Sequence, residues 1–148
     1  MRVQLFATCL VDTFFPETGE AVVKLLRHYR VDISYPKEQT CCGTPPNSAG
    51  YRKEARKAAE HFISVFDGTD PIVIPSGSCA SMVKNHYPDL FKDDPKMFRK
   101  AEAVARRTFE LPVSCSCPKS SRVSVSKRAW ENNLSRLMSI NTGTRRQN

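Results

Sequence analysis

Six cysteines are the residues of this 148-residue chain best suited to do chemistry. Four of them precede residue 80: Cys9, the adjacent pair Cys41 and Cys42, and Cys79. The apolar N-terminal stretch is too short for a secretory signal and has no small-residue cleavage site, so we expect a cytoplasmic protein. In that reducing compartment, cysteines serve more often as metal ligands or redox groups than as structural disulfides.

The elements that must position these thiols can be predicted from apolar periodicity. Short apolar runs predict three buried strands, at residues 3–9, 31–35 and 71–75. Apolar residues at helical spacing predict the helices that follow them, over residues 16–29, 51–66, 79–86 and 95–109. The order predicts an α/β fold, a small three-layer parallel sheet with right-handed crossovers.

Each of the four cysteines follows a predicted strand. Cys9 ends the first strand, Cys41 and Cys42 lie in the loop after the second, and Cys79 lies in the turn after the third. Ligands bind at the carboxyl ends of such strands, so we expect the cysteine loops to converge there. Helix N-termini near Cys9 and Cys79 should lower the pKa of both thiols. Gly43 lets its backbone approach a cofactor or take a positive φ.

Four converging thiolates could hold a tetrahedral zinc ion or an iron–sulfur cluster. Adjacent cysteines reach two metals of a cluster more easily than they chelate one ion, which favours iron–sulfur. A metal-free thiol–disulfide module, pairing Cys41 with Cys42 or Cys9 with Cys79, stays open as an alternative.

Two classes of phosphate chemistry are disfavoured. A phosphatase of the cysteine type needs an arginine six residues after its nucleophilic cysteine. The residue at that distance is Phe15 after Cys9 and Asn85 after Cys79. The sequence also has neither a dinucleotide fingerprint nor a phosphate-binding loop.

The cysteine spacing resembles a known family. Thirty-one residues separate Cys9 from Cys41-Cys42-Gly43, and 36 separate Cys42 from Cys79. Over residues 1–111 the chain resembles the cysteine-rich CCG domain that occurs in heterodisulfide reductases, glycolate oxidase iron–sulfur proteins and especially the lactate utilization A proteins.

That resemblance implies a cofactor and a role. The cofactor would be an iron–sulfur cluster of the 4Fe–4S type on Cys9, Cys41, Cys42 and Cys79, with Gly43 beside it. The role would be electron transfer in the oxidation of L-lactate to pyruvate, as an oxidoreductase subunit whose partners are other lactate-oxidation iron–sulfur subunits.

Two departures from the family pattern modify this expectation. The family motif ends in Cys-x-x-Cys, whereas Met82 stands where its second cysteine would be. Family members usually carry two repeats, and this sequence has no second CCG. We therefore interpret residues 1–111 as the N-terminal repeat and residues 112–148 as a basic, weakly structured tail, from a truncated or frame-shifted gene.

The formal charge of +8 is concentrated in that tail. Residues 112–148 hold seven basic residues and one acid, whereas residues 1–111 hold 16 and 14. Nucleic-acid binding through the tail is therefore a weak alternative, and Cys115 and Cys117 are interpreted as tail thiols. No apolar run approaches the roughly 20 residues of a membrane span. For a substrate carboxylate, the nearest candidates are Ser76 and Ser78.

Overall fold

The computed structural model describes residues 1–111 and, beyond them, the backbone of residues 113–115 and 123–125. In residues 1–111, four parallel strands form one sheet in the order β2-β1-β3-β4. Their bounds are β1 (Arg2–Leu5), β2 (Asp32–Ser34), β3 (Ile72–Ile74) and β4 (Thr108–Glu110). The sheet confirms the predicted parallel α/β class.

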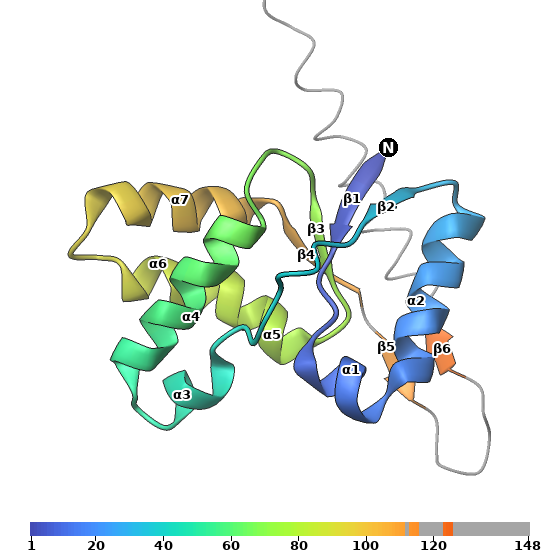
Figure 1. Ribbon diagram of the computed structural model, residues 1–148, viewed down its shortest axis with the longest axis horizontal. Coiled ribbons are helices and arrows are strands. Elements are labelled where there is room, and N and C mark those ends of the chain that lie inside the picture. The colour runs from blue at the N-terminus through green and yellow to red at the C-terminus, as the bar shows by residue number, and fades with distance from the viewer. Residues whose placement is uncertain (112, 116–122, 126–148) are drawn as a thin grey trace, which may run out of the picture.

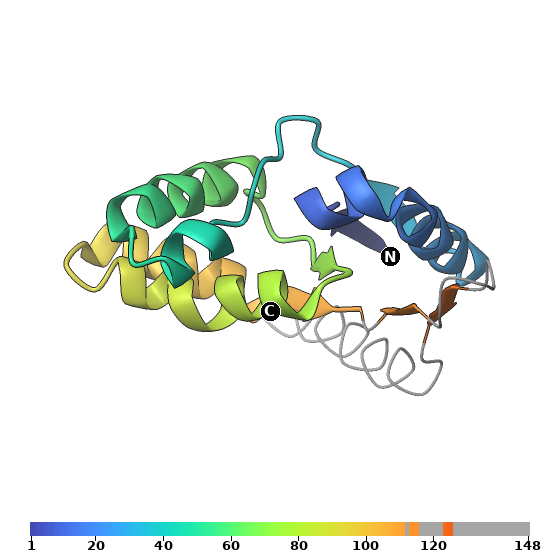
Figure 2. The same ribbon diagram turned by 90° about the horizontal axis from the view of Figure 1, so that it is seen from below.

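Helices cover both faces of this sheet. Helix α2 lies on one side, and α4, α6 and α7 lie on the other (Figure 1, Figure 2). The predicted three layers are therefore present. The helical elements are α1 (Cys9–Phe14), α2 (Pro16–His28), α3 (Thr44–Ser48), α4 (Arg52–Val65), α5 (Gly77–Ser81), the π-helix η1 (Met82–His86), α6 (Tyr87–Leu90) and α7 (Pro95–Arg106).

Alternation along β1 gives each face its own core. Val3 and Leu5 pack on the α2 side, in a cluster that includes Leu26. Phe6 packs on the opposite side, against the stacked rings of Phe62 and Phe66 from the α4 segment. The two clusters thus show which face of the sheet each helix layer covers.

The direction of the strand order reverses between β1 and β3. The chain passes from β1 to β2 through α2 on one face, then from β2 past β1 to β3 and β4 through helices on the other face. A change of direction combined with a change of face leaves both crossovers with the same hand, as right-handed crossovers require. In such sheets the reversal is the usual place for a ligand site.

Three local predictions were wrong. Strand β1 stops at Leu5, because buried Thr8 caps a helix that opens at Cys9. Helix α3 was not expected in the loop after Gly43. Phe109 continues the apolar spacing of α7, but the helix ends at Arg106 and Phe109 lies in β4, packed in the α2-side core.

Beyond the sheet, β5 (Val113–Cys115) and β6 (Val123–Val125) form an antiparallel pair. Both strands fall within the segment that we predicted to be a weakly structured tail. The rest of residues 112–148, including Cys117, lies outside the described residues, so the tail assignment stays a prediction. Within the part of the chain that the structure describes, no helix has the length and apolar character needed to cross a membrane.

Candidate cysteine site

The four cysteines lie at the carboxyl edge of the sheet, where α1, α3 and α5 gather below the strands in Figure 1. Cys9 is the first residue of α1, and Cys79 lies in α5. Cys41 and Cys42 immediately precede Gly43, which is the N-cap of α3. Cys9 and Cys79 thus follow the adjacent strands β1 and β3, on either side of the point where the strand order reverses.

Two of the thiols are in direct contact. The Cys42 thiol donates a hydrogen bond to the Cys79 sulfur at 3.1 Å. Both side chains are buried, with 2% and 6% of their surface exposed. The Cys42 sulfur also lies 3.1 Å from the Thr44 hydroxyl oxygen. This buried pair forms the inner half of the site.

Cys9 and Cys41 form the outer half. Cys9 is exposed and Cys41 is partly exposed. Burial is the main cause that raises the pKa of Cys9, followed by the charge of Cys41, a hydrogen bond to Cys41 and the charge of Cys42. The sequence-based expectation of a lowered Cys9 pKa was therefore wrong, because partial burial and, after it, the neighbouring thiols outweigh the positive end of α1.

The pKa values of the two inner thiols are shifted in opposite directions. The hydrogen bond from Cys42 is the main cause that lowers the pKa of Cys79, with burial opposing it and a Ser76 hydrogen bond assisting. Hydrogen bonding to Cys79 and burial raise the pKa of Cys42. The hydrogen bond thus favours the thiolate form at Cys79 over that at Cys42. The predicted lowering at Cys79 is confirmed, although its main cause is the second cysteine.

Two residues that sequence reasoning missed hold the cysteine loop in place. The Gln39 side-chain oxygen accepts from the Ala7 amide at 2.8 Å, and its nitrogen donates to the Pro36 carbonyl at 2.7 Å. Fully buried Tyr87 donates from its hydroxyl to the Cys42 carbonyl at 2.8 Å. Sequence reasoning missed their roles because the bond from Gln39 to Ala7 and the bond from Tyr87 to Cys42 join segments that are distant in the sequence.

Gly43 has two structural reasons to be glycine. Its φ is +85°, a conformation that residues with a side chain rarely adopt. A Cβ would also meet Ala58 Cβ at 3.1 Å and the Ala55 carbonyl oxygen at 3.3 Å. The predicted positive φ is therefore present, and the close approach that the structure shows is to helix α4.

Both metal sites expected from the sequence, a zinc ion and an iron–sulfur cluster, need several ligands around one centre. Among the described side chains, no group of three or more His, Cys, Asp or Glu surrounds one point closely enough to hold a metal ion. The four neighbouring thiols, with Cys79 favoured as thiolate, supply the sulfur donors that zinc and iron–sulfur clusters both use.

Met82 occupies the position of the missing family cysteine. It is buried, with 1% of its surface exposed, in the same core cluster as Cys42 and Cys79. It begins the π-helix η1, a type of turn that is frequent at functional sites. The described chain therefore has a thioether, rather than a further thiol, in the core cluster that contains Cys42 and Cys79.

The turn after β3 places two hydroxyls and a carboxylate close together. The Ser76 and Ser78 hydroxyls lie 3.3 Å apart. A Cβ on Gly77 would be 2.9 Å from Glu110 Oε1, so a carboxylate of the protein already faces this turn. The expectation that Ser76 and Ser78 receive a substrate carboxylate stays a prediction.

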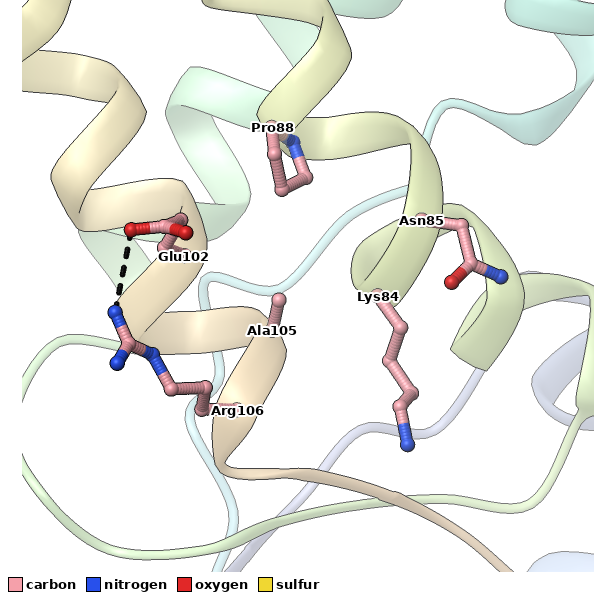
Figure 3. A pocket seen from close by; sticks show the side chains of 6 residues that line it. All are labelled: Lys84, Asn85, Pro88, Glu102, Ala105 and Arg106. Atoms are coloured by element: carbon pink, nitrogen blue, oxygen red, sulfur yellow. Dashed lines mark hydrogen bonds and ion pairs between the residues drawn. The ribbon is translucent and has the colours of Figure 1, made fainter.

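A separate groove lies between η1, α6 and α7 (Figure 3). Lys84 extends along it, and Arg106 pairs with Glu102 at 3.2 Å on its far side. None of the four cysteines lines this groove. It is therefore not part of the cysteine site.

Comparison with known proteins identifies the family. Residues 3–84 match the CCG cysteine-rich domain, which is more than half of the chain. The chain belongs to the CCG cysteine-rich domain family. This CCG chain is also 47% identical over 111 residues to lactate utilization protein A 2 of Bacillus cereus (strain Q1), covering 75% of this chain and 46% of that protein. It is 50% identical over 112 residues to lactate utilization protein A of an Exiguobacterium species, covering 74% and 45%.

The CCG chain thus spans less than half the length of these curated relatives. No solved structure matches it. The matched region includes all four cysteines of the site, and the family match itself ends at Lys84.

Proposed function

We propose that this chain is an iron–sulfur electron-transfer component of L-lactate oxidation. The observation that carries the proposal is the meeting of four thiols at the sheet reversal, with Cys42 and Cys79 at 3.1 Å. The similarity to lactate utilization protein A supports the physiological context. The proposed partners are other iron–sulfur subunits of a lactate-oxidising complex.

The proposed ligands divide into two roles. Cys42 and Cys79 form a buried base that excludes water from one side of the cofactor. Cys9 and Cys41 lie toward solvent, where a redox partner can approach. When bound, the 4Fe–4S type of cluster supplies one-electron transfer. Gln39 and Tyr87 keep the cysteine loop against the strand ends.

Anaerobic reconstitution of the full chain tests the proposal. Iron and sulfide incubated with the reduced protein should give an iron–sulfur absorption spectrum and stoichiometric iron and sulfide. Cys9→Ser, Cys41→Ser, Cys42→Ser and Cys79→Ser should each reduce iron content severalfold, whereas the matched control Cys117→Ser should not. A protein that stays colourless and metal-free, or that takes up zinc alone, would contradict the cluster.

Nucleic-acid binding through residues 112–148 is the alternative that the charge distribution leaves. It predicts binding that falls steeply with salt and disappears when residues 112–148 are deleted. Binding that survives the deletion would reject it.

A further inference from the structure

We infer that Cys42 and Cys79 form an intramolecular disulfide when the chain carries no cluster, which makes the site a two-electron thiol–disulfide centre as well. This inference goes beyond the electron-transfer function proposed above. It concerns the cluster-free chain and depends on the placement of two thiols.

The geometry selects this pair over those suggested by the sequence. The two sulfurs are 3.1 Å apart, so an approach of roughly 1 Å brings them to the ~2.05 Å of a disulfide. Adjacent Cys41 and Cys42 are poor partners, because Cα atoms across a trans peptide are about 3.8 Å apart, below the ~4.4–6.8 Å usual in disulfides. Cys9 makes its hydrogen bond with Cys41, not with Cys79.

The surroundings allow the small movement that bond formation needs. Cys42 lies in the loop before α3, and Cys79 lies in the five-residue helix α5, which passes directly into the π-helix η1. The hydrogen bond already directs the Cys42 thiol at the Cys79 sulfur. No long, regular helix must be displaced to join the two sulfurs.

A peroxide is the oxidant that the proposal requires. At Cys79, the more exposed of the two thiols, the S–H bond is replaced by S–OH while the peroxide O–O bond breaks and water leaves. The Cys42 sulfur then attacks the sulfenic sulfur. The S–S bond forms, the S–O bond breaks, and the Cys42 proton leaves in a second water. Two electrons pass from the thiol pair to the peroxide.

The disulfide would have a direct consequence for cofactor loading. It uses two of the four proposed cluster ligands, so the oxidised chain could not take up iron until it is reduced. It also protects both sulfurs from irreversible oxidation to sulfinic acid.

Peptide mapping of the full chain tests the inference. The reduced, metal-free protein is treated with one equivalent of hydrogen peroxide, alkylated and digested with trypsin without reductant. We expect the peptide of residues 38–52 joined to that of residues 58–84, with fragmentation placing the bond on Cys42. The cross-link should persist in Cys41→Ser and disappear in Cys42→Ser.

Two results would overturn the inference, and neither depends on a variant that must fold. One is a dominant cross-link from residues 3–24, which contain Cys9, in the wild-type chain. The other is conversion of Cys42 and Cys79 to sulfinic acids without a cross-link.

Iron uptake separates this inference from the proposed function. Peroxide treatment should lower iron incorporation about tenfold, and dithiothreitol should restore it. Full iron uptake by the cross-linked chain would contradict the shared use of the two sulfurs. A chain that never takes up iron, even when reduced, would reject the proposed function and leave the cross-link to be decided by the peptide map.

Discussion

Cys9 and Cys79 differ in their access to solvent and in the direction in which their pKa is shifted. Cys9 is exposed but its pKa is raised, whereas Cys79 is buried and its pKa is lowered. Exposure alone would predict the opposite order of reactivity. Partial burial and then the neighbouring thiols disfavour a negative charge on Cys9, whereas the hydrogen bond from Cys42 favours one on Cys79.

The Cys9 thiol should therefore be alkylated more slowly than its exposure alone would predict. Its raised pKa leaves little thiolate at pH 8, and the thiolate is the reactive form. In Cys41→Ser the pKa of Cys9 should fall part of the way toward the ordinary value of a cysteine, since burial still raises it. We expect Cys9 alkylation at pH 8 to become about two- to fivefold faster, with the midpoint of its pH profile moved downward.

The matched control for that measurement is Cys117→Ser, which lies far along the sequence from the site. Mass spectrometry of the peptide of residues 3–24 gives the rate for Cys9 alone. An unchanged pH midpoint in Cys41→Ser would show that Cys41 does not set the Cys9 pKa.

Gly43 allows a second prediction because Gly50 is its natural control. Both have nearly the same positive φ, +85° and +83°, but a Cβ on Gly50 would meet nothing within 4 Å. Alanine at Gly50 should cost about 1 kcal/mol from backbone strain alone. Alanine at Gly43 should cost about 2–3 kcal/mol, because it also presses on Ala58 and on the α4 backbone.

Urea unfolding followed by circular dichroism measures both free energies. Equal losses for the two variants would show that the close approach of Gly43 to α4 does not contribute.

At the scale of elements, Thr8 decides where the first strand becomes a helix. Its buried hydroxyl accepts a hydrogen bond from the Val11 amide at 3.3 Å, and this cap places Cys9 at the start of α1. Asp94 does the same for α7, accepting from the Lys96 and Met97 amides. One cap is at the cysteine edge and the other is remote from it.

Removing each cap should have similar effects on stability and different effects on the site. Thr8→Ala and Asp94→Ala should each lose about 1 kcal/mol of unfolding free energy. Only Thr8→Ala should change the rate of Cys9 alkylation, and Thr8→Ser, which keeps the hydroxyl, should restore it. A changed Cys9 rate in Asp94→Ala would mean that the effect reflects global stability.

The sequence was sufficient for elements that carry their own signals. Pro16 and Glu17 at the start of α2, and Asp94 before α7, are local features, and both helices begin where these residues predict. Strand β4 was missed, because Phe109 satisfies helical spacing and strand periodicity equally well over three residues. The choice depends on pairing with β3, which is a long-range contact.

The site could be predicted in outline for the same reason. Strand ends locate thiols to an edge, and the spacing around Cys41-Cys42-Gly43 marks the family. The contact between Cys42 and Cys79 could not be predicted, since it depends on side-chain directions set by α3 and α5. The roles of Gln39 and Tyr87 depend equally on the assembled fold.

At the scale of the whole molecule, two cores share one thin sheet. The α2-side cluster and the cluster that contains Cys42 and Cys79 are separated only by the strands. Damage to one core should therefore reach the other through β1 and β3, which carry the side chains that meet both clusters.

Leu26→Ala tests this coupling from the side opposite the cysteines. Leu26 is fully buried against the strands, so its truncation should cost about 2–5 kcal/mol. We expect a single urea transition in which helix content is lost and the buried thiols become reactive at the same denaturant concentration. Thiols that become reactive well before the helices unfold would show that the cysteine edge opens independently.

The separation of Cys42 and Cys79 along the chain also sets how long after Cys42 the ribosome adds Cys79. The two positions are 37 residues apart, and helix α4 and strand β3 lie between them. A ribosome adding about 5–20 residues per second needs roughly 2–7 s to make that stretch. During this interval Cys9, Cys41 and Cys42 already exist without their fourth partner, and Cys79 joins them only once β3 has paired with β1. Formation of the thiol pair thus marks the moment at which this edge of the nascent protein is complete.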